Sequence, residues 1–337
     1  MTWTLLIILL LVLFLPFFVK PIERNLEVFL FVMGFIAAIS SGVLDSTLWM
    51  KAVQNPIKIT LVVLIASILF KWLRKLIQRG VSYVTRRLDM NVFLTLMIVI
   101  LGLLSSVITA IVAAIVLVFI ISMVRIDRDT QIRTVILSCF SIAFGSVLTP
   151  VGEPLATITT SKLNEDFFFL FHLIGLEAIV GVLGIGIFAV FFLKPRRTDR
   201  IEGNGQAESY TEIITRTLKI YLFVMALTLL GSSYSNLVDR YLLDLNTTIL
   251  YWSNMVSAVL DNATLAAAEI SPSMKVETIR FILLSLIISG GMLIPGNIPN
   301  IIAASKLEIT SREWVRYGVP IGLVIMSLGF GYLVFIG

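Results

Sequence analysis

The sequence predicts an all-α polytopic membrane protein with two inverted-topology repeats, each holding a re-entrant hairpin and a broken transmembrane helix. Of its 337 residues, 58% are hydrophobic and 14% are charged, and the mean hydropathy is +1.00, values typical of membrane proteins. Residues 152–163 (GEPLATITTSKL) and 296–307 (GNIPNIIAASKL) match at five positions. Each copy follows an apolar run and opens with a Gly/Pro break, a pattern typical of paired broken helices in secondary transporters.

The predicted first repeat covers residues 1–197. Three leading spans are expected at about 2–19, 26–44 and 57–73, and the first lacks the basic n-region and cleavage site of a signal peptide. Lys and Arg gather in cytoplasmic loops, so the basic connector after residue 70 lies inside and the N-terminus outside. Segment 92–123 must be a re-entrant hairpin, because Arg125, Arg128 and Arg133 follow it. A broken helix at 132–163 and a span at 167–193 complete this repeat.

A cytoplasmic linker, 198–216, is predicted from Gly203, Gly205 and the lack of an apolar run. The second repeat, 217–337, then has one leading span, a hairpin at 247–269, a broken helix at 276–307 and a final span at 314–336. The first repeat has three leading spans and the second has one. Because both numbers are odd, the two hairpins enter the membrane from opposite faces, and the repeats are inverted. This count places both termini outside a cytoplasmic membrane, with the net charge of +5 in short inner loops instead of at a nucleic-acid site.

Four irregular segments are therefore expected at membrane depth, where backbone amides and carbonyls need protein or a water-filled cavity as partners. We expect them to converge and to bind an ion through helix termini, carbonyls and side chains. The backbone positions are Gly152, Pro154, Gly296 and Pro299. The candidate side chains are Thr149 and Glu153 in the first break, Asn297 and Asn300 in the second, Ser105, Ser106 and Thr109 in the first hairpin, and Ser257, Asp261, Asn262 and Thr264 in the second.

The two acids of this set have no acidic counterpart in the other repeat. Glu153 aligns with Asn297, and Asp261 aligns with Thr109. A charged side chain at the bilayer centre costs about 2.5 to 3.5 kcal/mol on insertion scales, so both acids are functional-site hypotheses. Hard oxygen ligands suit sodium, a desolvated carboxylate can also hold a proton, and competition between the two would give exchange. One cysteine and one histidine predict no transition metal, and no cofactor is expected.

Three motifs at these positions resemble the ion transporter superfamily (ArsB/NhaD-like permeases), in particular its NhaD-type sodium/proton antiporters. They are SAVLDNAT at 257–264, Gly-x-Pro at 152–154 and GNxPN at 296–300, and the resemblance covers nearly the whole chain. It implies inverted repeats, a homodimer with a scaffold and a moving transport region, and an ion site in which Asp261 and Asn262 match best. The first hairpin has Thr109 and Ala110 where a Ser-Asn-Thr-like tip would mark the dicarboxylate branch.

Other interpretations of the sequence stay open beside sodium/proton exchange. The alternative function is a sodium- or proton-coupled carrier of a small anion such as a carboxylate or arsenite, and a channel is a further rival. An enzyme is not expected, because GxGD, HExxH and GxSxG are absent from the sequence. The glycines and prolines could be packing kinks, and Asp261 could cap an external helix. Glu177 could relay protons or bond to a neighbouring helix, whereas Asp45 and Glu269 are interpreted as solvated.

Overall fold

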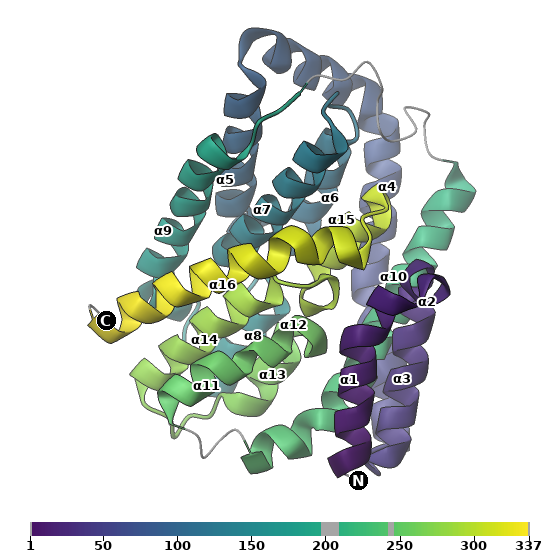
Figure 1. Cartoon of the computed structure of the whole chain (residues 1–337), viewed down its shortest axis with the longest axis vertical. Coiled ribbons are helices and arrows are strands. Elements are labelled where there is room, and N and C mark those ends of the chain that lie inside the picture. Colours follow the sequence, from purple (N-terminus) through teal and green to yellow (C-terminus); the bar gives the residue numbers. More distant parts are fainter. Residues whose placement is uncertain (1, 197–208, 242–245, 336–337) are drawn as a thin grey trace.

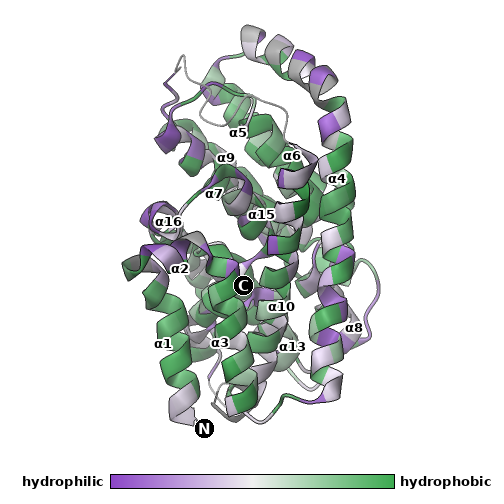
Figure 2. Ribbon diagram, turned by 90° about the vertical axis from the view of Figure 1, so that its right-hand side faces the viewer, coloured by the Kyte–Doolittle hydropathy of each residue, from purple (hydrophilic) through white to green (hydrophobic). Residues whose placement is uncertain are grey.

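The computed structural model describes residues 2–196, 209–241 and 246–335, and these residues form helices and no β-strand (Figure 1). Among them, five helices are long and apolar enough to cross a membrane. They are Ser46–Leu73, Met90–Ile108, Phe169–Phe192, Tyr210–Ser235 and Ser311–Phe335. Hydrophobic residues cover these helices along most of their length (Figure 2). The prediction of a multi-pass helical membrane protein is confirmed.

The N-terminal helices pack around α10, the first helix of the predicted second repeat. Helices α1 (Thr2–Phe18), α2 (Lys20–Arg24) and α3 (Leu26–Ser40) form one side of the molecule together with α10 (Tyr210–Tyr241) (Figure 1). The Tyr234 hydroxyl donates to the Leu5 carbonyl at 2.7 Å, and the Lys219 ammonium lies 2.8 Å from Glu27. Helix α4 also packs against α10.

Helix α4 (Ser46–Arg87) differs from the predicted span and connector. It is one helix of 42 residues, about 63 Å long at 1.5 Å per residue, roughly twice the hydrocarbon thickness. Asp45 caps it by accepting the Leu48 amide at 2.6 Å, and Gly80 is the only Gly or Pro between residues 57 and 87. The basic connector therefore continues the helix, because no residue ends it before Arg87.

The predicted first hairpin corresponds to α5 (Met90–Ile108) and α6 (Ala110–Ile121), which meet at Thr109. With 19 residues, or about 28 Å, α5 is long enough to cross a membrane by itself, whereas α6 is shorter. The re-entrant path of this hairpin stays a prediction. Helix α7 (Arg128–Ser146) packs between α5 and α9 (Phe169–Phe192), and α8 (Pro154–Leu163) lies between α7 and α9 in sequence.

Helix α10 begins inside the predicted linker. Residues 197–208 of the expected linker lie outside the described residues, but α10 already starts at Tyr210. Ser209 and Glu212 form a capping box there: the Ser209 hydroxyl accepts the Glu212 amide at 3.1 Å, and the Glu212 carboxylate accepts the Ser209 amide at 2.8 Å. This Ser-x-x-Glu signal moves the helix start into the predicted linker.

Eight described elements follow α10, seven of them of 15 residues or fewer. They are α11 (Thr247–Ser253), the 3-10 turn η1 (Asn254–Val256), α12 (Ser257–Leu260), α13 (Asn262–Glu269), α14 (Val276–Gly290), the 3-10 turn η2 (Ile294–Gly296), α15 (Ile298–Leu307) and α16 (Ser311–Phe335). The predicted second hairpin therefore consists of several short pieces, and its tip lies between α12 and α13.

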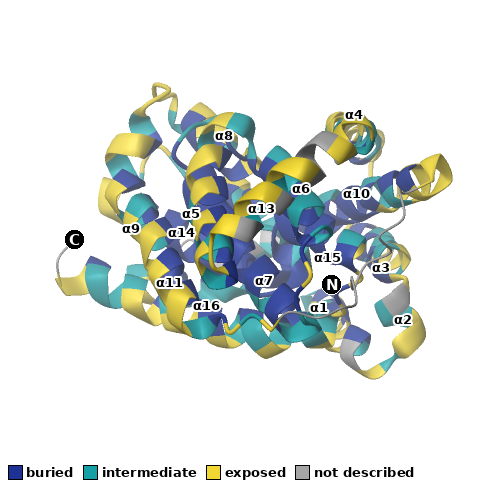
Figure 3. Cartoon of the chain, turned by 90° about the horizontal axis from the view of Figure 1, so that it is seen from above, coloured by how far each residue is buried: buried dark blue, intermediate teal, exposed yellow. Residues whose placement is uncertain are grey.

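The core lies around α7 and α14, the first segments of the two predicted broken helices (Figure 3). A Cβ atom on Gly145 of α7 would lie 1.7 Å from the Gly102 carbonyl oxygen of α5, so the two backbones touch. Two buried hydroxyls of α7 donate to backbone carbonyls: Ser138 to that of Thr134 at 2.8 Å, and Ser141 to that of Ile98 in α5 at 2.9 Å. Close packing with paired polar groups holds these central helices together.

Segments that the distribution of basic loops places on the same side of the membrane lie together in the structure. The Arg128 guanidinium is 2.9 Å from Glu313 and donates to the Leu307 carbonyl at 2.8 Å, and Asp127 accepts the Arg196 amide at 3.0 Å. These residues all belong to segments predicted to be cytoplasmic. Lys162, beside the acidic turn predicted to be outside, donates to the Ala267 carbonyl near the end of the second hairpin at 2.5 Å.

Candidate functional site

The tip of the second predicted hairpin is Asp261, which ends α12 and starts α13. Its backbone has φ 74° and ψ 127°, a combination that costs a non-glycine residue about 1 to 3 kcal/mol. Its carboxylate accepts the Thr264 amide at 3.2 Å and the Thr264 hydroxyl at 3.1 Å, which caps α13. The structure thus holds this carboxylate beside the first turn of a helix.

The tip of the first predicted hairpin, Thr109, has nearly the same geometry. Its φ is 74° and its ψ is 150°, and it joins α5 to α6. The Thr109 hydroxyl accepts the Val112 amide at 3.3 Å, and the next amide, of Ala110, donates to the Gly152 carbonyl at 2.8 Å. Thr109 and Asp261 therefore occupy equivalent backbone positions, and only the second carries a charge.

The first break covers the seven residues 147–153 between α7 and α8. Gly152 is required there, because a Cβ atom would lie 1.8 Å from the Ser146 carbonyl oxygen. Glu153 follows as the N-cap of α8, with extended backbone and no capping hydrogen bond from its side chain, and Pro154 occupies the first turn. Glu153 is only 4% exposed, and neither of its carboxylate oxygens accepts a hydrogen bond.

The second break, 291–297, also has seven residues and leads into a helix of ten, as the first does. Asn297 is the N-cap of α15, and its φ of −155° equals that of Glu153. The Asn300 amide group donates to the carbonyls of Gly290 and Leu293, both at 2.9 Å, and so holds the break closed. The Asn297 Nδ2 group has no hydrogen-bond partner.

The four turns converge across the two halves. Helix α6 packs against α15, and α13 packs against α8, so the helix after each tip meets the helix that follows the break of the other predicted repeat. The side chains of Ser146, Asn297 and Asp261 lie near the Glu153 carboxylate. The Asn262 Nδ2 atom lies 3.3 Å from the position of a Cβ atom on Gly290.

Unpartnered polar atoms concentrate at this meeting point. Both oxygens of Glu153, the Nδ2 atoms of Asn262 and Asn297, and the Asn300 Oδ1 atom are buried without a hydrogen-bond partner. Buried polar groups are normally paired, so such a group of orphans is expected where a ligand or water binds. Of the predicted side chains, the structure brings Glu153, Asp261, Asn262, Asn297 and Asn300 to this position.

The sequence profile of one family, described as "Protein of unknown function (DUF1646)", matches residues 2–336. The chain belongs to this family. No curated protein matches the chain. The family description assigns no activity, so the geometry of the four turns carries the functional argument for this member of the DUF1646 family.

The predicted hydroxyl ligands of this DUF1646 protein are engaged in other contacts. Ser105 donates to the Gly102 carbonyl at 2.6 Å and Ser106 to that of Leu103 at 2.8 Å. Thr149 donates to the Ser106 carbonyl at 2.5 Å, and Ser257 shares a hydrogen bond of 2.5 Å with Ser289. These hydroxyls fix the backbone around the turns, and an ion would have to use their remaining lone pairs.

Sequence reasoning missed one charged group in the second broken helix. Arg280 of α14 forms an ion pair with Glu177 of α9, whose side chain is 6% exposed. Of the alternatives considered for Glu177, the structure therefore shows a bond to a neighbouring helix. Glu177 is an isolated charge in an apolar run, and Arg280 stands at the start of another; opposite charges in two such runs are the signal that could have suggested the pair.

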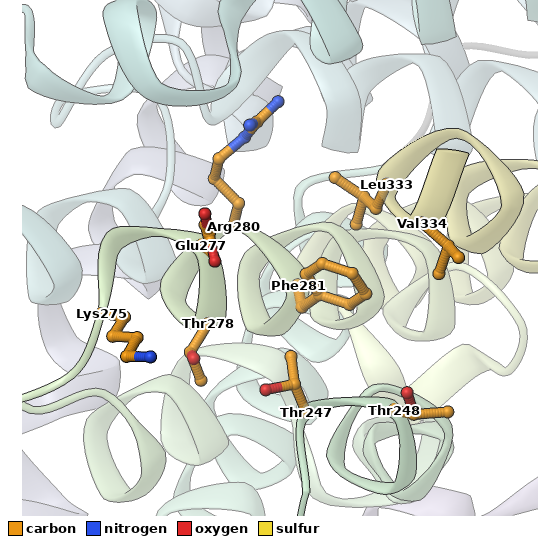
Figure 4. Close-up of a pocket in the computed structure, with 9 residues that line it drawn as sticks. All are labelled: Thr247, Thr248, Lys275, Glu277, Thr278, Arg280, Phe281, Leu333 and Val334. Atoms are coloured by element: carbon orange, nitrogen blue, oxygen red, sulfur yellow. The ribbon is translucent and has the colours of Figure 1, made fainter. Parts of the chain in front are cut away.

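A cavity of about 400 Å³ lies beside this ion pair, between α11, α14 and α16. Its polar lining comes from Thr247, Thr248, Lys275, Glu277, Thr278 and Arg280. Figure 4 shows Arg280 extending from α14 away from the two α11 threonines. No residue of the four turns lines this cavity.

The interpretation of Glu269 as a solvated acid is wrong. Glu269 is the last residue of α13, and its exposed fraction is 0%. The residue sits at a segment end in the sequence, but α8, α10 and α14 pack around α13 and exclude solvent. Asp45, the other acid interpreted in this way, is exposed.

Proposed function

We propose that the protein is a secondary active transporter that exchanges sodium for protons across the membrane. The observation that carries this proposal is that the four turns bring two acids near each other, Asp261 and the buried Glu153, whose carboxylate oxygens have no hydrogen-bond partner. Two like charges in a low-dielectric site repel each other unless a cation or a proton lies between them. Either ligand relieves the same repulsion, so the two compete.

An inverted-repeat architecture is part of the proposal. Each half contributes a tip with positive φ (Thr109 and Asp261), a seven-residue break and a ten-residue helix that starts at an N-cap with extended backbone. The crossed packing of α6 on α15 and of α13 on α8 agrees with two units that face each other. The segments predicted to be cytoplasmic contact one another at one end of the molecule, and this supports the predicted orientation.

The proposed cation shell has carboxylate, amide and carbonyl oxygens as ligands. Glu153 and Asp261 would supply the charge, Asn297 and Asn300 would supply neutral oxygens, and the carbonyls of the glycine breaks would complete the shell. When protons reach both carboxylates, the site loses its charge and the sodium ion is released. The resemblance to NhaD-type antiporters suggests a homodimer in which a scaffold supports the moving site.

One observation favours the second candidate, a sodium- or proton-coupled carrier of a small anion. The Nδ2 groups of Asn262 and Asn297 are buried donors without partners, and donors of this kind bind carboxylate or arsenite oxygens. The two acids at the same position work against an anion through charge repulsion. For this reason we place cation exchange first.

Transport in proteoliposomes tests the proposal. Purified full-length protein is reconstituted with a pH-sensitive dye inside, and a sodium gradient is imposed. Wild type should move protons against sodium, and Asp261→Asn or Glu153→Gln should abolish this flux while the protein stays folded. The matched control is Glu165→Gln, which removes an exposed carboxylate in the turn after α8 and should leave the flux unchanged.

A correctly inserted wild-type protein that moves no protons under a sodium gradient would sink the exchange proposal. Uptake of a labelled dicarboxylate or of arsenite under the same gradient would then support the second candidate. In that case Asp261→Asn should retain or increase uptake, because it removes a negative charge from the site of an anion.

A further inference from the structure

A glycine of α10 lies directly against the helix that the Asp261 side chain caps. Gly231 is buried within α10, and a Cβ atom there would lie 2.1 Å from the Thr264 Cγ2 atom and 2.8 Å from the Thr264 hydroxyl oxygen. Contact between carbon atoms normally occurs at about 3.5 to 4.0 Å. A larger residue therefore does not fit at position 231 while Thr264 keeps its place.

Thr264 is the residue that holds the Asp261 carboxylate. Its amide and its hydroxyl donate to the same carboxylate oxygen, Oδ2, at 3.2 Å and 3.1 Å. The methyl group and the hydroxyl of threonine share one Cβ atom, so a single staggered rotamer places both. In the rotamer observed, the methyl group lies against Gly231 and the hydroxyl reaches Asp261. The contact with α10 is thus linked to the hydrogen bond at the carboxylate.

A side chain at position 231 can be accommodated in two ways, and both affect Asp261. Rotation of Thr264 about χ1 moves its hydroxyl out of the well from which it donates to Asp261. Movement of the first turn of α13 away from α10 carries the Thr264 amide with it and displaces the tip, because Asp261 is the N-cap of this helix. Either response changes the hydrogen bonds of the carboxylate.

The first tip has neither part of this arrangement. Val112 follows Thr109 by the same three positions, and its amide donates to the tip, but valine has no hydroxyl. Helix α4 packs against α6 as α10 packs against α13, yet the single glycine of α4, Gly80, has nothing within 4 Å of its Cβ position. The close glycine and the hydroxyl donor accompany the tip that carries the acid, although the same backbone forms without them.

Helix α10 is itself held by the N-terminal helices. A Cβ atom on Gly34 of α3 would lie 2.9 Å from the Ala226 carbonyl oxygen of α10, and the Tyr234 hydroxyl donates to the Leu5 carbonyl of α1. Because α10 is packed on this side as well, added volume at position 231 acts on α13.

We propose that Gly231 is a positioning residue for the Asp261 carboxylate and that it acts through Thr264. The absence of a side chain at position 231 lets the Thr264 methyl group lie against α10 and so directs the Thr264 hydroxyl to the carboxylate. Only the consequence for sodium rests on the proposed function. If Asp261 binds the cation, Gly231 sets the affinity of the site, because changes to groups that orient a metal ligand alter affinity by about 10- to 100-fold.

Infrared difference spectroscopy of the full-length protein in detergent tests this role without any transport measurement. Subtracting the spectrum of the same protein with Asp261→Asn isolates the carboxyl bands of Asp261, whose positions depend on its hydrogen bonds. Gly231→Ala should shift these bands. Thr264→Ser removes the methyl group and keeps the hydroxyl, so it should leave the bands near their wild-type positions and reverse part of the shift when combined with Gly231→Ala.

The matched control is Gly186→Ala in α9, where a Cβ atom would lie 2.4 Å from the Val99 Cγ2 atom. This change overpacks a methyl group outside the four turns and should leave the Asp261 bands unchanged. In equilibrium binding of radioactive sodium, Gly231→Ala should weaken the affinity by about tenfold or more, and Gly186→Ala by less than about twofold. Adding Thr264→Ser to Gly231→Ala should restore part of the lost affinity.

A further variant, Thr264→Ala, removes the hydroxyl without adding an atom, so it tests the link to Asp261 even if Gly231→Ala does not fold. It should also shift the Asp261 bands, and unchanged bands in this variant would overturn the proposal.

The proposal is likewise overturned if Gly231→Ala leaves the Asp261 bands in place, or if Gly186→Ala shifts them equally. A double variant with Thr264→Ser that is as perturbed as Gly231→Ala alone would also contradict it, since the methyl contact would then transmit nothing. A wild-type protein that binds no sodium, while Gly231→Ala still shifts the bands, would refute the exchange function and leave the positioning role standing.

Discussion

The two hairpin tips have the same backbone and different chemistry. Thr109 and Asp261 share φ 74°, and each accepts the amide of the residue three positions later. The two breaks show the reverse arrangement, since Glu153 of the first half stands where the second half has Asn297, with φ of −155° in both. Each half therefore contributes one acid, but from a different turn.

This difference separates what the scaffold requires from what a function requires. Positive φ, helix capping and chain reversal are satisfied equally by Thr109 and by Asp261, so the geometry of a tip does not demand a carboxylate. The same holds for Glu153, because Asn297 occupies the equivalent N-cap without a charge. The acids are the part of the site that folding alone does not explain.

The largest expected effect concerns the tips. Asp261→Gly and Thr109→Gly both relieve a positive φ and both remove a cap, so their effects on folding should be alike and within about 2 kcal/mol. In proteoliposomes, Asp261→Gly should abolish sodium-driven proton flux, whereas Thr109→Gly should reduce it by less than about tenfold, since Thr109 supplies only a neutral oxygen. Equal losses in the two variants would contradict the distinction between the tips.

The glycines of the breaks should show the next largest effect. Gly152→Ala places a Cβ atom 1.8 Å from the Ser146 carbonyl oxygen, and Gly296→Ala places one 2.5 Å from that of Gly290. Overpacking against backbone costs about 1 to 3 kcal/mol or more, so both should lower the thermal midpoint in detergent, the first more strongly. The matched control is Gly184→Ala in α9, where a Cβ atom meets nothing within 4 Å and stability should not fall. An unchanged midpoint for Gly152→Ala would refute the closeness of this contact.

Two ion pairs that join the halves sharpen the comparison further. Glu177 and Arg280 are 6% and 22% exposed, whereas Arg128 and Glu313 are about one-third exposed. Glu177→Gln leaves a partly buried guanidinium without its partner and should destabilise the protein by about 3 kcal/mol. Glu313→Gln should cost about 1 kcal/mol or less, because solvent screens this pair. Equal midpoint shifts by thermal unfolding would show that α9 and α14 do not depend on their ion pair.

The smallest expected effect lies at the start of the central helices. Asp127 caps α7 by accepting the Thr130 amide at 3.0 Å, whereas Lys275 stands before α14 with similar backbone angles and no cap from its side chain. Asp127→Ala should cost about 1 kcal/mol, and Lys275→Asp should gain about 0.5 to 1 kcal/mol. Unfolding midpoints of the two variants measure this difference.

The contribution of Asp127 to the free energy of unfolding should also depend on pH. Partial burial opposes ionisation, but hydrogen bonds from the Arg196 and Thr130 amides hold the pKa of Asp127 below its ordinary value. Its stabilisation should be complete above the unfolded pKa of about 3.9 and disappear as the pH falls through the lower folded value. The difference between wild type and Asp127→Ala should therefore shrink in acid, and a constant difference would contradict the role of the ionised cap.

Much of the fold could be predicted from the sequence, because apolar runs, basic loops and Gly/Pro breaks are local signals. The position of both breaks and of both tips came from such signals. The length of α4 could not be predicted as easily, since its basic C-terminal part is polar but contains no residue that ends a helix before Arg87. The Ser-x-x-Glu pattern of Ser209 and Glu212 indicates the start of α10. The polar composition of the predicted linker hid this signal.

The missing parts of the site depend on contacts between distant segments. Arg280 and Glu177 are 103 residues apart in sequence, so neither run predicts the other. The burial of Glu269 depends on how α8, α10 and α14 surround α13. The use of Ser105 and Thr149 as backbone donors likewise follows from packing, which the types of residue do not determine.

The central claim, that Glu153 and Asp261 together bind one cation, is tested most directly by equilibrium binding of radioactive sodium to the purified protein. Wild type and Glu165→Gln should bind sodium with affinity that falls as the pH is lowered, because protons compete for the same carboxylates. Glu153→Gln and Asp261→Asn should each lose this binding. Sodium binding that is the same in both variants as in wild type would contradict the account.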